Sequence, residues 1–534
     1  MHPSPLTAGR KRAGRCSLAV VSRAAQLFTR VRGLTCWIED PAASYTLVRA
    51  AFLRALALVY LAAFGSLWTQ IIGLVGENGI LPAARYLEAT RAQLGDGAWS
   101  AVPTLFWWGT SDAALSGACA VGAALAIAAV AGLAPGWVFA GLWGLWLSLF
   151  NVGQDFLAFQ WDLLLLETGF LAIFLAPWRL APGREERPSL AVIWLLRWLL
   201  VRLMLRSGLV KLASGDALWR GLTALSVHYE TQPLPTWAGW WAHQLPPGVQ
   251  MASCAAMFAI ELLLPLLMLG PRRARQVACA GTALLMATIL VTGNYCYFNW
   301  LTLALCLVLL DDRALTRELP AIWLPAPSEE AARPREARWK RTANGAVAAL
   351  ILTLTLGQLG PLVLGGFRPP ELLAELGRAL RPFCIFNHYG LFAVMTPERP
   401  EIEIEGSLDG VSWRAYEFRY KPGDPARPPT FVAPHQPRLD WQMWFAALGD
   451  CRENPWFVRF LVRLLEGKAE VRTLLANDPF PEAPPRYLRT SVARYRFTDL
   501  ATRRRTGAWW KREPKGPYCP VVSLRPAGSS ASDM

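Results

Sequence analysis

Long apolar segments constrain this 534-residue chain more than any other feature. A bilayer core takes about 20 apolar residues per helix. Nine segments of roughly this kind occur: Ala51–Val75, Ala113–Gly132, Gly136–Phe150, Phe156–Pro177, Leu190–Leu212, Met251–Leu269, Gln276–Thr292, Tyr295–Leu310 and Ala346–Leu364. We therefore predict an α-helical membrane bundle of about nine helices over residues 51–366. The segment Gly136–Phe150 is short enough to be re-entrant, so eight or ten helices are also compatible.

Basic residues are distributed unevenly between the loops that join these segments. If the N-terminus lies inside, the loops on the same side are Arg179–Arg187, Pro271–Arg275 and Asp311–Arg341. All three loops are rich in Arg. The outside loops, 76–112 and 214–250, contain only three basic residues, namely Arg85, Arg91 and Arg220. Basic loops stay on the cytoplasmic side and nine is an odd number of spans. We therefore predict a cytoplasmic N-terminus and an exported C-terminus.

The net charge of +15 is better explained by membrane orientation than by nucleic-acid binding. No RNA- or DNA-reading motif surrounds the basic residues, so we expect no nucleic-acid partner. Residues 1–50 are basic and lack the apolar stretch of a cleaved signal, which indicates a cytoplasmic tail. The short tail and compact loops favour a bacterial inner membrane, with the C-terminal domain in the periplasm.

The sequence changes character after residue 366. "EIEIEGSLDGVSWRAYEFRY" alternates polar and apolar residues around a Leu-Asp-Gly turn, which is typical of a β-hairpin. "ENPWFVRFLVRLLEG" predicts a helix that begins near Pro455 and ends near Gly467. We expect residues 367–524 to form an exported, β-rich α+β domain of sandwich-like arrangement, followed by a disordered tail over 525–534. Cys384, Cys451 and Cys519 lie in this domain, where one disulfide could form.

Acidic residues in one predicted span are followed by basic residues in the next. Asp155 and Asp162 are seven residues apart, as are Gln160 and Glu167, and each pair would share a helix face. The next span contributes Arg197, Arg202, Arg206 and Lys211. A charge at the bilayer centre is costly, so we expect these groups to pair across the two helices. The pairs either maintain helix register or line a polar cavity that binds a substrate or moves a proton.

Three further groups have both a structural and a functional interpretation. Lys211 either extends toward the interface or acts as a partly buried base. The loop with His228, Tyr229 and Glu230 is either part of an aromatic belt or a lid over a cavity mouth. In "RLDWQMWFAALGD", Trp441 and Trp444 are either domain core or an exposed patch that holds client chains.

Several kinds of chemistry are not indicated. The chain has five His without metal-ligand spacing, and no C-x-x-C, G-x-S-x-G, H-E-x-x-H, phosphate-binding or dinucleotide-binding motif occurs. We expect neither a metal nor a cofactor. Asn294, Asn299 and Glu261 are interpreted as polar residues with structural partners in the bundle.

Several of these stretches resemble the lipase maturation factor family. They are "IIGLVGENGILPAARYL", "TGNYCYFNWLTLALCLVLLDD", "FNHYGLFAVMTPERPEIEIEG", "KPGDPARPPTFVAPHQPRLDWQMWFAAL", "NPWFVRFLVRLLEG" and "PPRYLRTSVARYRFT". The resemblance implies a polytopic membrane protein with a lumenal or exported domain. Animal members of the family assist folding of secreted lipases in the endoplasmic reticulum. Asn387, His388 and Tyr389 in "NHYG" are candidates for client or interface contacts, and His388 departs from the small polar residue expected there.

A fainter resemblance relates the bundle to vitamin K-dependent γ-carboxylases, through "SGLVKL" before a Trp-containing turn. This resemblance implies Lys211 as the base, although the family has two lysines where this chain has one. Our first hypothesis is a maturation or folding factor for exported proteins, lipases among them, without turnover chemistry. The alternative is a membrane enzyme that modifies a lipid, quinone-linked or peptide substrate and uses Lys211 as base.

Overall fold

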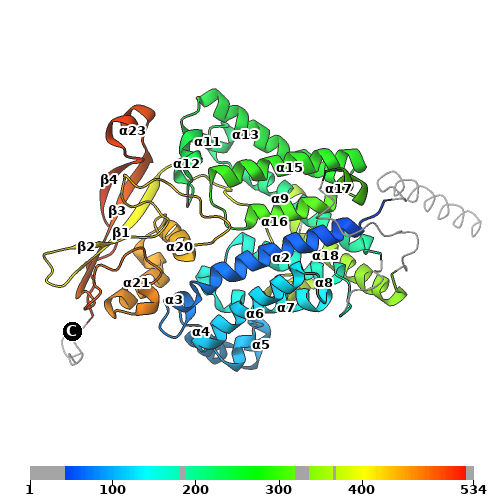
Figure 1. Cartoon of the computed structure of the whole chain (residues 1–534), viewed down its shortest axis with the longest axis horizontal. Coiled ribbons are helices and arrows are strands. Elements are labelled where there is room, and N and C mark those ends of the chain that lie inside the picture. The colour runs from blue at the N-terminus through cyan, green and yellow to red at the C-terminus, as the bar shows by residue number, and fades with distance from the viewer. Residues whose placement is uncertain (1–42, 181–186, 319–335, 365–367, 525–534) are drawn as a thin grey trace, which may run out of the picture.

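The computed structural model describes residues 43–180, 187–318, 336–364 and 368–524. Helices form one part of the molecule, and a smaller domain with an antiparallel sheet covers one end of them (Figure 1). The predicted C-terminal tail and most of the predicted N-terminal tail lie outside the described residues. The first helix among the described residues, α2, begins at Thr46, slightly before the expected boundary at residue 51.

Among the described residues, the first half of the helical region contains eight α-helices and three short 3-10 helices. They are α2 (Thr46–Trp68), α3 (Ile71–Val75), α4 (Ala83–Leu94), η1 (Gly95–Gly97), α5 (Ala98–Ala101), η2 (Leu105–Trp108), α6 (Asp112–Val130), α7 (Pro135–Val152), η3 (Gln154–Phe156), α8 (Gln160–Leu175) and α9 (Leu190–Ala213). Helix α8 is largely buried by its neighbours, which explains why its sequence is apolar on every side.

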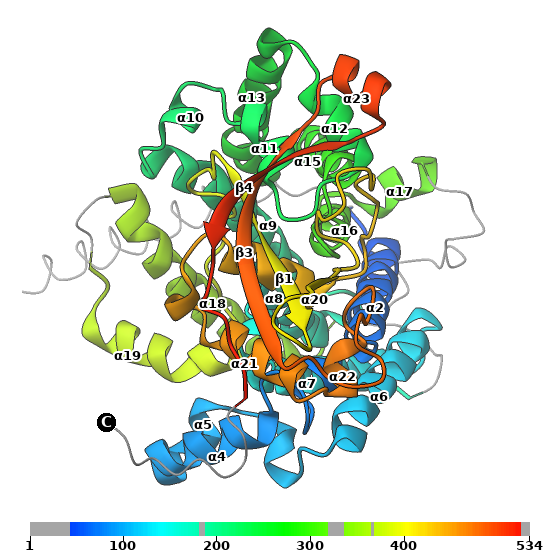
Figure 2. The ribbon, with the colours of Figure 1, turned by 90° about the vertical axis from the view of Figure 1, so that its left-hand side faces the viewer.

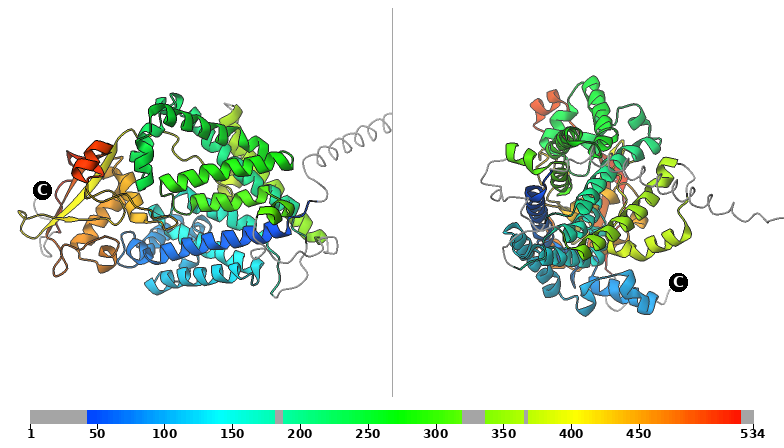
Figure 3. Two further views of the ribbon diagram at one scale, coloured as in Figure 1. Left: turned by 45° about the horizontal axis from the view of Figure 1, so that its top comes forward. Right: turned by 90° about the vertical axis from the view of Figure 1, so that its right-hand side faces the viewer.

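The second half continues the region and then leads into the sheet domain. Its elements are α10 (Ala217–Arg220), α11 (Leu225–Thr231), α12 (Trp237–His243), α13 (Pro247–Leu262), α14 (Leu264–Met268), α15 (Arg272–Thr292), α16 (Phe298–Cys306), η4 (Leu307–Leu309), α17 (Asp312–Glu318), α18 (Arg338–Leu364), α19 (Glu371–Leu380) and η7 (Arg381–Phe383). Figure 3 shows the long helices running in roughly similar directions, away from the sheet.

The expected number of nine membrane spans is wrong. Among the described residues, five helical segments are long and apolar enough to cross a membrane: Thr46–Trp68, Asp112–Val130, Pro247–Met268, Arg272–Thr292 and Arg338–Leu362. Helices also form at the other predicted segments, but α8 and α16 are short and α9 carries four basic side chains. Helix α7, of 18 residues, is also not among the five. Apolar composition marks burial in protein as readily as burial in lipid, and the sequence pattern does not separate the two.

The C-terminal domain is built on four antiparallel strands in the order β2-β1-β3-β4, of which Figure 2 labels β1, β3 and β4. The strands are β1 (Arg399–Ser407), β2 (Arg414–Tyr416), β3 (Tyr487–Phe497) and β4 (Trp510–Pro517). The predicted β1–β2 hairpin is confirmed, with Ile404 opposite Tyr416. Strand β4 was not expected, because "WKREPKGP" is charged, contains two prolines and lies exposed at the sheet edge. Only one sheet occurs among the described residues, so the sandwich-like arrangement is not confirmed.

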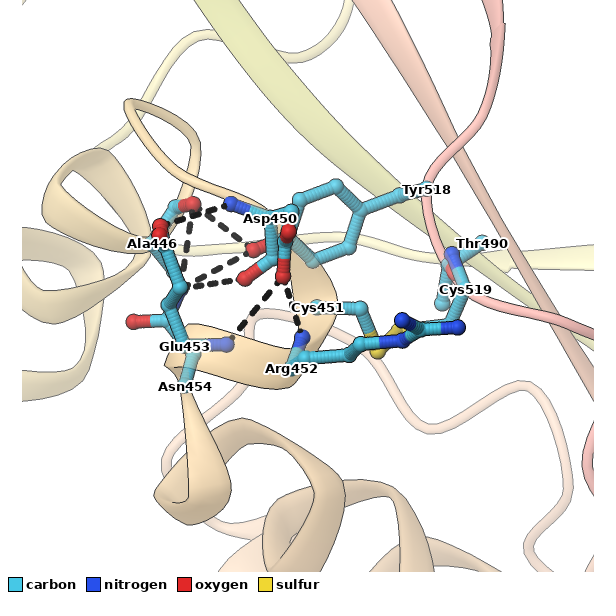
Figure 4. Close-up of a disulfide and its surroundings, with 9 residues drawn as sticks. All are labelled: Ala446, Asp450, Cys451, Arg452, Glu453, Asn454, Thr490, Tyr518 and Cys519. Carbon is cyan, nitrogen blue, oxygen red and sulfur yellow. Dashed lines mark hydrogen bonds between the residues drawn. A yellow bond between two sulfur atoms is a disulfide. The ribbon is translucent and has the colours of Figure 1, made fainter.

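Helices cover the sheet on the side of the helical region and at its ends. They are α20 (Arg438–Ala446), η8 (Cys451–Glu453), α21 (Pro455–Leu465), α22 (Ala469–Arg472) and α23 (Leu500–Thr506). The predicted helix after Asn454 is confirmed as α21, and its apolar face, which includes Phe457 and Phe460, is buried. Cys451 and Cys519 form a disulfide that joins η8 to the segment after β4 (Figure 4).

Candidate functional site

Glu167 is a fully buried carboxylate in α8, and partners from two parts of the chain surround it. Arg202 of α9 forms an ion pair with its Oε1 atom. Its Oε2 atom accepts hydrogen bonds from the Asn387 backbone N–H at 3.0 Å and the Tyr389 hydroxyl at 2.7 Å. Arg202 also donates to the Asn387 carbonyl. The helix pair and the segment before β1 are thus joined at one charged centre.

Asp162 has its cation in the C-terminal domain. Arg438, at the start of α20, donates to Asp162 Oδ1 at 2.9 Å and to Oδ2 at 3.0 Å, which is a bidentate pair. The Tyr297 hydroxyl donates to Oδ1, and Arg438 also donates to the Phe156 carbonyl at 2.7 Å. Both charged side chains are at most 1% exposed. The expected pairing of Asp162 with a base of α9 is therefore wrong.

The remaining members of the expected polar network have separate positions. Asp155 lies in η3, exposed and outside α8, so its seven-residue spacing from Asp162 places the two on no common helix face. The Gln160 side chain accepts a hydrogen bond from the Gly390 backbone at 3.0 Å. Arg206 donates to the Gln358 carbonyl of α18 at 3.5 Å. Of the acids and bases expected to pair between α8 and α9, the structure brings together Glu167 and Arg202.

Uncharged side chains extend the contact on both sides of these pairs. Asn294 accepts hydrogen bonds from Val432 N–H at 2.7 Å and Ala433 N–H at 3.0 Å. Gln70 accepts from Arg438 N–H at 2.9 Å and donates to the Gln436 carbonyl at 2.8 Å. Both side chains satisfy backbone groups of the C-terminal domain that would otherwise be buried without partners. This second set fixes the segment immediately before α20.

A third group of paired charges lies between the sheet and the loop that contains Glu230. Arg399 of β1 pairs with Glu401, which also pairs with Lys421 at 2.9 Å. Arg399 donates in addition to the Glu230 carbonyl at 3.0 Å and the Pro233 carbonyl at 2.7 Å. The Glu230 carboxylate accepts from Phe497 N–H at 2.9 Å, and burial raises its pKa. Glu230, in the loop interpreted as an aromatic belt or a lid, is therefore hydrogen-bonded to strands β1 and β3.

The aromatic residues of α20 belong to this contact as well. Trp441 is 3% and Trp444 is 5% exposed. Trp441 packs edge-on against Trp161 of α8, with ring centroids 4.7 Å apart, and Trp444 donates to the Thr231 carbonyl at 2.8 Å. The two rings are core between the two parts of the molecule. They are not available as an exposed patch for client chains.

His388 differs from its neighbours Asn387 and Tyr389 because its side chain is exposed. It borders a cavity of about 810 Å³ that Arg378 and Arg381 also line. Neighbouring residues partly shield the ring from water, and this partial desolvation, together with the charges of Arg206 and Arg381, lowers the pKa of His388 to about 4. The imidazole is therefore neutral near pH 7.

Lys211 lies apart from these contacts. Its Nζ donates to both carboxylate oxygens of Glu261, each at 2.7 Å, and lies 5.4 Å from the Trp219 ring centroid. Lys211, His228 and Tyr229 line a second, smaller cavity, and His228 Nε2 lies 3.1 Å from the Tyr295 hydroxyl. Burial and the Lys211 charge lower the pKa of His228 to about 4. In the part of the chain that the structure describes, no group of three or more His, Cys, Asp or Glu could hold a metal ion.

Apolar spans, a sheet domain and buried ion pairs between them define an integral membrane protein whose C-terminal domain is docked on its helices. The model of the lipase maturation factor transmembrane domain family matches residues 47–317, and that of the C-terminal domain family matches residues 385–520. The chain belongs to the lipase maturation factor family.

Relatives are similar along most of the chain. Lipase maturation factor 2 of Mus musculus and of Homo sapiens are each 37% identical to it, over 90% of this chain and 84% and 83% of theirs. Lipase maturation factor 1 of Bos taurus is 36% identical, over 90% of both chains. No solved structure matches the chain. These relatives support a maturation factor, and they do not favour a membrane enzyme with Lys211 as base.

Several residues of the contact were not predicted from the sequence. No sequence pattern linked the acids of α8 to Arg438, Gln70 or Arg399. A buried ion pair between residues 276 positions apart leaves no local periodicity. One signal was available, because α8 and α9 contain unequal sets of charges and a charge in an apolar segment requires a partner somewhere in the fold.

Proposed function

We propose that this protein is a membrane-anchored maturation factor that helps exported lipases reach their active fold. The observation that carries the proposal is its similarity, over about nine tenths of its length, to proteins named lipase maturation factor 1 and 2. Both domains of the family, transmembrane and C-terminal, are present in this chain. The buried ion pairs at Glu167 and Asp162 hold the two domains in one arrangement. A client bound to the C-terminal domain would thereby be held at a set position relative to the membrane.

The proposed compartment of the C-terminal domain is the exported side, in a bacterium the periplasm. The unequal distribution of basic residues among the loops supports this orientation. The Cys451–Cys519 disulfide supports it independently, because disulfides persist in oxidising compartments and are rare in the cytosol.

The proposed client surface differs from the residues first considered for it. Asn387, Tyr389, Trp441 and Trp444 are buried in contacts within the chain. Exposed apolar side chains remain on the same domain, including Phe431 and Phe445, which are 48% and 45% exposed. Exposed aromatic groups on a domain that is otherwise well packed are candidates for holding incompletely folded chains.

The experiment compares a deletion strain with the same strain carrying the gene. The measured quantity is the activity of an exported lipase divided by the mass of that lipase, because a maturation factor changes the active fraction and not the chemistry. We expect the ratio to fall several-fold in the deletion strain and to return with the gene. An exported hydrolase of another fold serves as the control and keeps its ratio. Equal lipase ratios in the two strains would refute the proposal.

A further inference from the structure

A small cavity lies among α9, α11, α13, α15 and α16, away from the ion pairs that hold the C-terminal domain. Its volume is about 180 Å³. Most of its wall is apolar, with Leu203, Met204, Met257, Leu285 and Ile289 among the lining residues. The polar atoms on this wall are few, and they determine which ligand would fit.

The charged groups in the cavity neutralise one another. Lys211 and Glu261 form an ion pair at 2.7 Å, with side chains 7% and 8% exposed. Both carboxylate oxygens accept from Nζ, so neither charge is left uncompensated. An anionic group that approached Lys211 would also approach Glu261. The cavity therefore favours an uncharged ligand.

Asn299 has an amide group without a partner in the described structure. The side chain is fully buried and lines the cavity, and neither its Nδ2 nor its Oδ1 atom makes a hydrogen bond there. His228 Nδ1, on another part of the wall, also lacks one. A buried amide without hydrogen bonds is unfavourable, so these atoms favour a ligand that both donates and accepts. A hydroxyl group meets this requirement.

The opening of the cavity lies between two membrane-spanning helices. Among the lining residues, Ser253 of α13 and Thr288 of α15 are exposed. Their hydroxyls donate to carbonyls of their own helices, at Val249 and Leu284, and so present little polarity outward. Around them α13 and α15 expose apolar side chains, among them Met251, Leu284 and Val291. Because α15 and the segment formed by α13 and α14 are long and apolar enough to cross a membrane, a ligand that passed between them would come from the bilayer.

We propose that this cavity binds the headgroup of a neutral, hydroxyl-bearing membrane lipid, with its hydroxyl on Asn299 and its chains left in the bilayer. The cavity is smaller than sites that enclose whole drug-sized ligands, which suits a glycerol-sized headgroup. The inference does not rest on the maturation role, although Leu391 and Phe392 of the C-terminal domain also line the cavity.

The test is photolabelling of the full-length protein in lipid nanodiscs. The probe is a diacylglycerol analogue with a diazirine near the glycerol and an alkyne tag, and matched analogues of a fatty acid and of phosphatidylglycerol serve as comparison arms. We expect the diacylglycerol probe to label peptides of α13 or α15 at least five times more than either anionic probe. Stronger labelling by an anionic probe, or no labelling of these helices, would overturn the proposal.

Two substitutions and a control make the test specific. Asn299→Leu keeps the side-chain size and removes the amide, and we expect labelling to fall about five-fold, in line with loss of one or two hydrogen bonds. Ser253→Trp fills the opening and should lower labelling while Asn299 remains. Thr282→Val is the matched control, because the Thr282 hydroxyl is also buried without a partner but does not line the cavity. Equal labelling of Asn299→Leu and Thr282→Val proteins of equal thermal stability would contradict the assignment.

Discussion

The charge of Asp162 is balanced by Arg438, which lies 276 residues later in the chain. Both groups are buried, so the cost of removing them from water is offset only while they remain together. The same holds at Glu167, which shares its two oxygens between Arg202 of the helical region and Asn387 and Tyr389 of the C-terminal part. At the scale of single residues, the helical region and the C-terminal domain must therefore stay docked to keep these buried charges paired, in addition to burying apolar side chains.

Arg438→Met tests this requirement. The substitution keeps much of the side-chain volume but leaves Asp162 buried without its cation, and we expect a loss of about 3–5 kcal/mol in the free energy of unfolding. Asp162→Leu combined with Arg438→Met removes both charges and should recover most of the loss. Thermal unfolding in detergent measures both variants. A double variant no more stable than the single one would contradict the assigned pair.

His435 predicts a pH dependence at the same contact. Its Nδ1 atom lies 2.9 Å from the Ser66 hydroxyl of α2, and burial together with the charges of Arg438 and Arg419 lowers its pKa to about 4. The unfolded chain binds a proton near pH 6.5, whereas the folded protein does so only near pH 4. This contribution to stability is therefore present above about pH 6.5 and is lost as the pH falls toward 4.

The measurement is the midpoint of thermal unfolding between pH 7.5 and 4.5, for the wild type and for His435→Gln. Glutamine keeps a group that can hydrogen-bond Ser66 but does not titrate. We expect the midpoint of the wild type to fall further over this range than that of the variant. Parallel curves would show that His435 does not contribute.

At the scale of elements, the sequence predicted the β1–β2 hairpin, helix α21 and helices at all nine apolar segments, because each has its own periodicity. It overestimated the membrane spans, because α8 and α16 are short and α9 carries four basic side chains. It missed β4, whose edge position tolerates Lys, Arg and Pro. At the candidate site it indicated Glu167 and Arg202, while Arg438 depended on tertiary contacts that have no local pattern.

Gly73 illustrates a contact between elements that depends on the absence of a side chain. It lies in α3, and a Cβ atom there would be 2.4 Å from the Glu470 carbonyl oxygen of α22 and 2.9 Å from Leu474 Cγ. The added methyl group of Gly73→Ala would push the backbones of α3 and α22 apart. We expect the free energy of unfolding to fall by about 1–3 kcal/mol and the C-terminal domain to be proteolysed faster. Gly65→Ala in α2, where nothing lies within 4 Å, is the control. Equal proteolysis rates for the two variants would contradict this close approach.

At the scale of the whole molecule, orientation decides where the docked domain acts. We expect alkaline phosphatase fused after Leu524 to be active, since the enzyme requires an exported location, and the same reporter placed before Thr46 to be inactive. Immunoblots that show equal amounts of the two fusions control for expression. Activity of the N-terminal fusion alone would reverse the orientation assigned from the basic loops.

The long separation between Asp162 and Arg438 also has a consequence for the order of synthesis. A ribosome completes α8 well before it reaches residue 438, so the newly inserted helices carry an unbalanced carboxylate until the last fifth of the chain has emerged and folded. A chain that stops early keeps this charge unbalanced in an apolar setting. Neutralisation of Asp162 therefore waits until α20 has docked, and membrane proteases that recognise unpaired charges would distinguish chains that lack the C-terminal domain from finished ones.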